Sequence, residues 1–272
     1  MGPTFGHCGL NFRELIQDAA QLCPDAGQPI IKTSEWAEKM LNFVPSAKQA
    51  EVLDSDARYL ILCCNRQWGK TTTIALKALH RALTIPDQSI VILSRSKLQA
   101  GILIERARMF AVRLGHKIRR AFGHQFSLKL ENGSQIFAVA HTTDTSVGPT
   151  ANVLIVDEAA LVKDLVYFSV SPFTARTYGA IWLMSTPRRP AGFFYNIWHS
   201  QEDTRWHKIF SPVADCPDID PDFLAMQKRA DEVKYSQDFL CQFTQPADRL
   251  FTVEMLDEMT RPNDGEPSWP RA

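Results

Sequence analysis

The amino-acid sequence predicts an α/β fold with a mainly parallel sheet and helices on both of its faces. Short apolar runs alternate with longer amphipathic stretches through the middle of the chain, which is typical of βαβ crossovers. The short runs are apolar throughout, as expected for strands that are buried on both faces. An Asn-Gly pair between two further apolar segments indicates a hairpin turn. We therefore expect one α/β core with an antiparallel hairpin added to its sheet.

The apolar runs place four strands in this core. They lie at residues 59–64, 89–94, 153–157 and 180–185. The hairpin is expected from residues 126–130 and 135–140, on either side of Asn132-Gly133. Amphipathic stretches predict helices at residues 34–43, 45–53, 70–83 and 97–114, with a further helical segment between the last two strands. Thr33 or Ser34 is a plausible N-cap for the first helix.

The pattern weakens after Pro187. We expect an aromatic-rich helix at residues 192–199, a short strand at 206–211, and helices at 221–232 and 235–243. These segments are too short for a second sheet domain, so residues 34–200 are interpreted as the core and residues 201–259 as a small lid or linker subdomain. Residues 1–33 and 260–272 are polar or rich in Pro and Gly, and are expected to be an irregular segment and a tail.

Composition excludes several classes of protein. Among 272 residues, 30 Lys and Arg balance 30 Asp and Glu, so any contact with nucleic acid must be a local patch. No run approaches the 18 or so apolar residues of a membrane span, and we expect neither membrane insertion nor secretion. The six cysteines are scattered without a Cys-x-x-Cys pair, which favours reduced thiols. His116, His124 and His141 lack metal-ligand spacing, so we expect no zinc site from them.

The strongest motif lies between the first strand of the core and the helix after it. Residues 64–71 read Cys-Asn-Arg-Gln-Trp-Gly-Lys-Thr, which matches the phosphate-binding pattern G-x-x-x-x-G-K-[ST] except that Cys64 replaces the first Gly. In that position, backbone N–H groups and the helix N-terminus form an anion cradle. We expect Lys70 to neutralise the β- and γ-phosphates of ATP and the Thr71 hydroxyl to bind Mg²⁺. The predicted nucleotide-binding residues in the loop are Cys64, Asn65, Arg66, Gln67, Trp68, Gly69, Lys70, Thr71 and Thr72. The alternative is a Gly-Lys-Thr that only caps a helix.

Two carboxylates end the third strand of the core, at the sheet edge where such folds bind ligands. Asp157 is expected to hold Mg²⁺, usually through water, and Glu158 to deprotonate the water that attacks the γ-phosphate. A base that acts on water favours ATP hydrolysis. A kinase, by contrast, transfers the phosphoryl group to another acceptor and has less use for such a base. Thr186 ends the next strand, and its hydroxyl should lie beside this pair if the strands are neighbours. A plain strand end before Pro187 is the alternative.

Other candidate residues have two interpretations each. Arg66 either stabilises charge at the γ-phosphate or forms a salt bridge on the outer face of the loop. Gln49 either reads the adenine edge or is a solvated helix residue. Trp68 is interpreted as packing against neighbouring helices rather than stacking on a base. The basic candidates for nucleic acid, for each of which a solvated surface residue is the alternative, are Arg106, Arg108, Arg113, His116, Lys117, Arg119, Arg120, Arg188 and Arg189.

The order of these motifs resembles the ATPase domain of the large terminase subunit of tailed bacteriophages. The resemblance rests on Gln49, Arg-Gln-x-Gly-Lys-Thr, Leu-Ile-Val-Asp-Glu-Ala-Ala and Ser-Thr-Pro before an aromatic helix, and covers about residues 34–259. It implies a phosphate-loop fold of RecA/ASCE type with ATP and Mg²⁺ as ligands. By this resemblance Lys70 binds phosphate, Thr71 and Asp157 bind Mg²⁺, Glu158 is the catalytic base and Thr186 is a coupling residue. Gln49 would contact adenine, and Arg66 the γ-phosphate.

The resemblance also implies partners. Such subunits push double-stranded DNA through a portal protein into a procapsid, assembled as a ring and aided by a small terminase subunit. We expect a chain that is monomeric alone, in the host cytoplasm and transiently at the portal vertex. After residues 248–251, which look like the usual exit from the ATPase domain, 21 residues remain, so no nuclease activity is expected from this chain.

One departure and two alternatives remain open. Family members often show Arg-Gly where this chain has Val147-Gly148, so an Arg offered to a neighbouring subunit would come from elsewhere. Candidates for it are Arg106, Arg120 and Arg176. A helicase-like or repair translocase is the alternative enzyme, although it usually needs a second sheet domain. A nucleotide-gated assembly module without turnover is the alternative outside catalysis, and Glu158 disfavours it.

Overall fold

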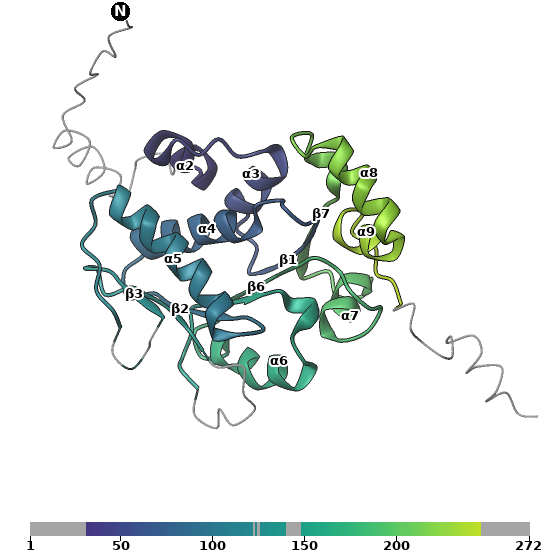
Figure 1. Ribbon diagram of the computed structural model, residues 1–272. Helices are drawn as coiled ribbons and strands as arrows, with labels where there is room; N and C mark the ends of the chain where they lie inside the picture. Colours follow the sequence, from purple (N-terminus) through teal and green to yellow (C-terminus); the bar gives the residue numbers. More distant parts are fainter. Residues whose placement is uncertain (1–30, 122, 124–125, 140–147, 246–272) are drawn as a thin grey trace, which may run out of the picture.

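The sheet has seven strands in the order β3-β4-β2-β5-β6-β1-β7 (Figure 1). The computed structural model describes residues 31–121, 123, 126–139 and 148–245. The strands are β1 Tyr59–Cys64, β2 Ser89–Leu93, β3 Ser127–Lys129, β4 Gln135–Ala138, β5 Val153–Asp157, β6 Ala180–Ser185 and β7 Trp206–Ser211. All neighbouring strands are parallel except β3 and β4, which form an antiparallel pair. The predicted parallel sheet and its hairpin addition are confirmed.

Helices cover both faces of this sheet, as predicted. The α-helices are α2 Thr33–Leu41, α3 Ala47–Asp54, α4 Lys70–Thr84, α5 Lys97–Arg113, α6 Asp164–Val170, α7 Phe193–His199, α8 Pro221–Ala230 and α9 Glu232–Asp238. Short 3-10 turns are η1 Ala159–Leu161, η2 Ser171–Thr174 and η3 Val213–Asp215. In Figure 1 the helices α2 to α5 lie on one face of the sheet, and α6 and α7 on the other.

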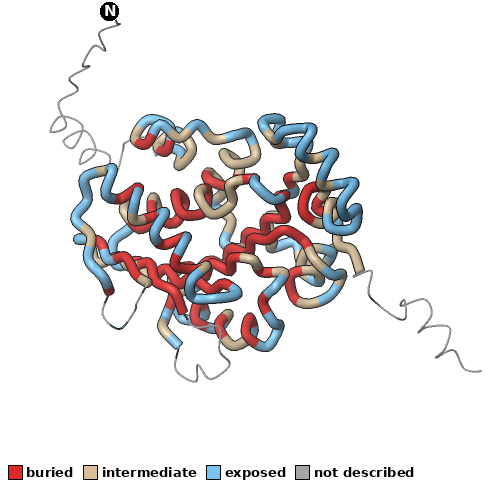
Figure 2. The backbone as a smooth tube through the Cα atoms, in the orientation of Figure 1, coloured by how far each residue is buried: buried red, intermediate tan, exposed pale blue. Residues whose placement is uncertain are grey.

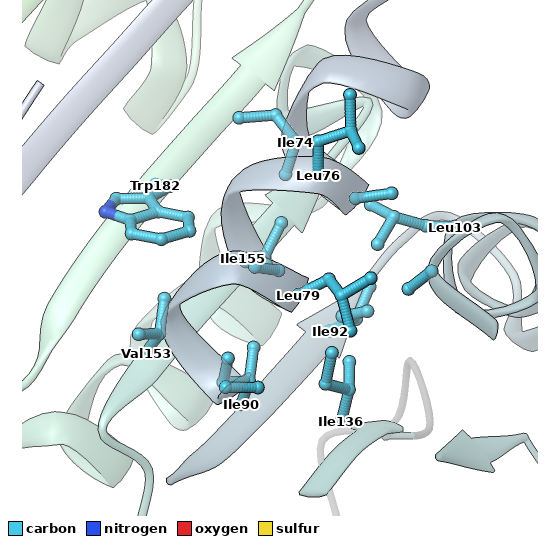
Figure 3. Packing of buried hydrophobic residues seen from close by; sticks show 14 of the residues in the cluster. Ile74, Leu76, Leu79, Ile90, Ile92, Leu103, Ile136, Val153, Ile155 and Trp182 are labelled. Atoms are coloured by element: carbon cyan, nitrogen blue, oxygen red, sulfur yellow. The ribbon is translucent and has the colours of Figure 1, made fainter. Parts of the chain in front are cut away.

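The core is split into two layers by the alternation of side chains along each strand. On one face, Ile92 and Ile155 pack against Leu79 of α4 (Figure 3). On the other, Val91 and Leu154 belong to the cluster that includes the side chains of α6 and α7. Figure 2 shows the buried residues concentrated in the sheet and in the helix faces turned toward it. Both faces of the central strands are therefore shielded from solvent, which explains why these strands are apolar at every position.

The first two helices differ from the prediction at their starts. The α2 helix begins at Thr33 after Lys32, which provides no side-chain cap, so neither Thr33 nor Ser34 is the N-cap. Instead, the backbone N–H and the hydroxyl of Ser34 both donate to the Asp54 carboxylate. The α3 helix begins at Ala47 rather than at Pro45, because Ser46 forms a capping box with Gln49. Tertiary contacts and capping thus decide where these helices start.

The position of β7 shows that the predicted boundary between core and lid is wrong. The sequence placed residues 206–211 in a lid, but this strand pairs in parallel with β1 along its whole length and forms the edge of the core sheet. Its pattern was weak because an edge strand is only partly buried, and Phe210 is exposed.

Beyond β7, the described residues contain η3, α8 and α9, which remain candidates for a separate subdomain. The predicted helices 221–232 and 235–243 end earlier than expected. The backbone of Asp231 is extended and its carboxylate caps the N-terminus of α9, so one helix stops and the next begins there.

Several predictions lie outside the described residues. These are the irregular segment up to residue 30, the tail and domain boundary near residue 260, the exit at 248–251, and the side chains of His124, His141 and Val147. No helix in the described part of the chain is long and apolar enough to cross a membrane. Within the same residues, no group of three or more His, Cys, Asp or Glu is placed to hold a metal ion.

Candidate nucleotide-binding site

The loop between β1 and α4 has the backbone shape of a phosphate cradle. Gly69 has φ +89° and caps the N-terminus of α4, a helix of 15 residues, and Gln67 is also left-handed with φ +71°. Alternating right- and left-handed residues turn successive N–H groups toward one side, and the N-terminus of α4 adds its positive end. The loop therefore has a backbone conformation that can present N–H groups to an anion.

The strand β7 fixes this loop from outside. The backbone N–H of Asn65 donates to the Ser211 carbonyl at 3.0 Å, and its side-chain amide donates to the same carbonyl at 3.2 Å. Trp68 is 3% exposed and its indole N–H donates to the Ser211 hydroxyl at 2.7 Å. The packing interpretation of Trp68 is confirmed, because a ring buried in this way has no free face for a base.

The residue in place of the first loop glycine is part of the core. Cys64 ends β1, is fully buried and belongs to the cluster on the α4 face of the sheet. Burial raises the pKa of its thiol well above the ordinary value, so the sulfur is neutral at physiological pH. Cys64 can offer only its backbone to a phosphate.

Lys70, Glu158 and Thr186 converge at the carboxyl edge of three adjacent strands. The ammonium of Lys70 lies 3.4 Å from Glu158 Oε1 and 3.4 Å from Thr186 Oγ1. They meet because β6 lies between β1 and β5, so the segments that follow these strands are neighbours. Thr186 was expected to lie beside the carboxylate pair, and it contacts the same ammonium as Glu158. Burial lowers the pKa of Lys70, whereas the neighbouring Glu158 and Asp157 carboxylates raise it; the pKa lies above its ordinary value and the amine stays charged.

The two carboxylates differ in their surroundings. Asp157 is 5% exposed and accepts the Glu158 backbone N–H at 2.9 Å. Burial and the adjacent Glu158 charge raise the pKa of Asp157 to about 7. Glu158 turns away from the strand in a left-handed conformation with φ +51°. Its Oε2 is buried and has no hydrogen-bond partner among the described residues.

These groups fit Mg²⁺ and a water molecule. The Asp157 carboxylate and the Thr71 hydroxyl are the hard oxygen donors that Mg²⁺ prefers, on the strand end and the first turn of α4. A bound dication would also favour the ionised form of Asp157, whose pKa is otherwise raised. The buried Glu158 Oε2 needs a hydrogen donor, which a water on that side would provide.

Gln49 braces the loop from α3. Its Oε1 accepts the Ser46 backbone N–H at 2.9 Å, and its Nε2 donates to the Trp68 carbonyl at 2.8 Å. The solvated-helix interpretation is therefore wrong, because both ends of the amide are bonded and the side chain is partly buried. The contact with adenine stays a prediction.

Arg66 lies on the outer face of the loop. Its guanidinium pairs with the Asp238 carboxylate at 3.1 Å, which is the salt bridge that the sequence offered as an alternative. The role at the γ-phosphate stays a prediction. Asp238 was missed, and no local pattern marks it, because it is one of several acids on short C-terminal helices.

The basic candidates for nucleic acid do not form one cluster. Arg108 donates to the Ser127 carbonyl and pairs with Glu105, and it lines a pocket of about 370 Å³ together with Arg120. Arg188 and Arg189 line a separate pocket of about 640 Å³. Exposed members on or after α5 are Arg106, Arg113, His116, Lys117, Arg119 and Arg120. The exposed Arg176 follows η2, so the three candidates for an Arg acting on a neighbouring subunit stay open.

Several known proteins are similar to this chain in sequence or in fold. Residues 62–258 match the family model described as terminase large subunit, T4likevirus-type, N-terminal. The structure is similar to the large terminase ATPase domain of Thermus phage P74-26, with a TM-score of 0.65 and 18% identity, covering 79% of this chain and 100% of that one.

Two longer structures are also similar. The large terminase of a thermophilic bacteriophage, in complex with ATP-γ-S, has a TM-score of 0.61 and 16% identity, covering 73% of this chain and 53% of that one. The large terminase of bacteriophage HK97 has a TM-score of 0.60 and 16% identity, covering 86% of this chain and 55% of that one. This chain thus spans about half the length of both proteins.

These likenesses establish the α/β fold of the terminase ATPase domains, and the family model extends over more than half of the sequence. The phosphate loop and the Asp157-Glu158 strand end lie inside the matched range. The chain belongs to the large terminase subunit family of the T4-like-virus type, as its N-terminal ATPase domain.

Proposed function

We propose that this chain hydrolyses ATP and that hydrolysis drives double-stranded DNA into a procapsid. The observation that carries the proposal is the convergence of Lys70, Glu158 and Thr186 beside a phosphate cradle. A cation, a carboxylate and a hydroxyl at one sheet edge are groups that attack of water on a terminal phosphate uses together with Mg²⁺. A pure binding module would need no carboxylate at this place.

Each site residue has a separate role in the proposed reaction. The loop N–H groups from Gln67 to Thr72 would hold the phosphates, because those of Asn65 and Arg66 already donate to the Ser211 and Asp238 carbonyls. Lys70 would neutralise the phosphate charge. Thr71 and Asp157 would hold Mg²⁺, which when bound offsets the negative charge of the phosphate oxygens. Glu158 Oε2 is the buried acceptor that would orient and deprotonate the attacking water. Thr186 would sense the result through Lys70, because the two side chains are 3.4 Å apart.

Gln49 and Arg66 are proposed to act from the rim of the site. Gln49 would have to give up one of its two hydrogen bonds to reach adenine. Arg66 would have to leave Asp238 to reach the γ-phosphate. Both movements are local changes of one side chain.

The proposed partners follow from family membership. They are double-stranded DNA, a portal protein, a small terminase subunit and further copies of the same chain in a ring. The place of action would be the host cytoplasm and, transiently, the portal vertex of a procapsid. The basic residues around α5 and after β6 are the proposed contacts with DNA.

Steady-state phosphate release from ATP tests this function. We expect turnover by the wild-type chain that rises with protein concentration and with linear duplex DNA. Glu158→Gln should keep nucleotide binding and lose on the order of 10²- to 10⁴-fold in turnover, because the amide cannot accept the proton. Lys70→Ala should lose binding. Glu202→Gln, an exposed glutamate in the loop before β7, is the matched control and should behave as wild type.

Three outcomes would contradict the proposal. Equal loss of binding in Glu158→Gln and Lys70→Ala would refute the separate roles of the two residues. Stimulation by single-stranded rather than duplex DNA would favour a helicase-like translocase. ATP binding without turnover under every condition would favour a nucleotide-gated assembly module.

A further inference from the structure

The helix α4 carries a buried lysine that the proposed reaction does not use. Lys77 is 7% exposed and lies two helical turns after Lys70, on the same face of the helix. Its ammonium donates to the Leu53 carbonyl at 2.9 Å and to the Ser55 carbonyl at 2.6 Å. It also lies 5.1 Å from the ring centroid of Trp182, on the α4 side of the sheet (Figure 3). A buried cation is retained only with such partners.

The two carbonyls belong to the C-terminal end of α3. Leu53 is in the last turn of this helix, and Ser55 is its C-cap. Carbonyls at this end of a helix have no partner within the helix and need a donor from elsewhere. His207 of β7 adds a second attachment, because its Nδ1 lies 2.8 Å from Ser55 Oγ and its Nε2 lies 3.3 Å from Glu51 Oε1. The helix α4 and the strand β7 thus hold the end of α3 together.

The opposite end of α3 meets the phosphate loop. Gln49 is in the first turn, and its Nε2 donates to the Trp68 carbonyl at 2.8 Å. The same nitrogen would lie 3.0 Å from a Cβ added at Gly69, so the amide rests against the residue that caps α4. A helix of eight residues is too short to be stable without tertiary contacts. Its length is about 12 Å, so a shift at the C-terminal end also moves Gln49.

We propose that Lys77 and His207 are positioning residues that hold α3 so that Gln49 selects adenine over other bases. The inference rests on the proposed ATP site and on the predicted contact between Gln49 and adenine. Neither residue touches the nucleotide. They fix the last turn of α3, which keeps the Gln49 amide beside the loop, at the place from which it can turn to the base. A glutamine on a loosely held helix would offer its donor and acceptor in many positions and would distinguish bases poorly.

The test is the ratio of the dissociation constants for GTP-γ-S and ATP-γ-S, measured by titration calorimetry on the whole chain. Lys77→Met removes the ammonium but keeps most of the apolar stem, so the buried Leu53 carbonyl loses its donor and the end of α3 has to move. We expect weaker binding of ATP-γ-S alone, so that the ratio falls by about three- to tenfold, the range of one hydrogen bond. His207→Ala, at a partly exposed position, should lower the ratio in the same direction.

The matched control is Lys208→Met. Lys208 donates to the carbonyls of Trp198 and Ser200, so it holds the C-terminal end of α7 as Lys77 holds that of α3. The helix α7 carries none of the predicted nucleotide-binding residues. The control should therefore lose stability in urea and keep the wild-type ratio. An equal fall of the ratio in Lys208→Met would assign the effect to general destabilisation and overturn the inference.

A double-mutant cycle separates positioning from general structure. In a Gln49→Ala background, adding Lys77→Met should no longer change the ratio. An effect that persists without Gln49, or equal weakening of both nucleotides, would overturn the inference. If Lys77→Met does not fold, His207→Ala decides by whether the ratio falls. A wild-type chain that binds neither nucleotide would refute the ATP site itself. Wild-type preference for adenine with an unchanged ratio in both variants would refute only the roles of Lys77 and His207.

Discussion

Replacing Gly69 by Ala tests the cradle conformation most directly. Gly69 has φ +89°, and an L-residue in the left-handed region costs about 1 to 2 kcal/mol. A Cβ there would lie 3.0 Å from Gln49 Nε2, so the amide must shift and weaken its bond to the Trp68 carbonyl, a further cost of about 1 kcal/mol. In Gly69→Ala, the loop conformation that presents its N–H groups to phosphate would therefore be destabilised by about 2 to 3 kcal/mol.

Urea unfolding and ATP-γ-S titration measure the two consequences. We expect Gly69→Ala to lose about 2 to 3 kcal/mol of unfolding free energy, or to bind nucleotide at least about tenfold more weakly if the loop relaxes instead. Gly123→Ala is the matched control, because Gly123 has φ +77° with nothing within 4 Å of its added Cβ. It should lose only the backbone part, about 1 to 2 kcal/mol, and no nucleotide affinity. Gly69→Ala with wild-type affinity and no greater loss than the control would refute the reasoning.

Two further changes probe the support of the site. Trp68→Phe should lose about 1 to 3 kcal/mol of unfolding free energy in urea, because the buried Ser211 hydroxyl loses its indole donor; a wild-type denaturation curve would contradict this. Lys77 is 7% exposed, and burial lowers the pKa of its ammonium to about 8. The unfolded chain therefore holds this proton more tightly, and the unfolding free energy should rise by up to about 3 kcal/mol as the pH increases from 8 toward 10.5. Lys77→Met should flatten this part of the pH profile, and an unchanged slope in the variant would assign the effect to other groups.

Local signals explain the parts of the fold that the sequence predicted well. The bounds of β1, β5 and β6 agree with the apolar runs, because strands buried on both faces need apolar residues at every position. The phosphate loop was recognised because its chemistry requires a fixed spacing of Gly, Lys and Thr within one turn. Asp157 and Glu158 were recognised because two charged residues directly follow a continuous run of apolar residues, and this pattern is visible in the sequence alone.

The features that the sequence did not predict depend on contacts between residues that are far apart in the chain. Residues 206–211 were correctly predicted as a strand but were assigned to a lid. The sequence of a half-exposed edge strand does not show which strand it pairs with, and here that strand is β1. Gln49 and Trp68 are 19 positions apart, and their contact depends on how α3 packs beside the loop. Ser211 and Trp68 are 143 positions apart, and their contact depends on the pairing of β7 with β1 beside the loop.

The sequence by itself determined the strand and helix order, the phosphate loop and the two carboxylates, because each is written in neighbouring residues. Only the tertiary structure decided that Lys70, Glu158 and Thr186 meet, since that depends on β6 lying between β1 and β5. It alone joined Arg66 to Asp238, which are 172 positions apart. A carboxylate attracts any cation at any distance in sequence, and packing of the sheet and its last helix selects which one it contacts.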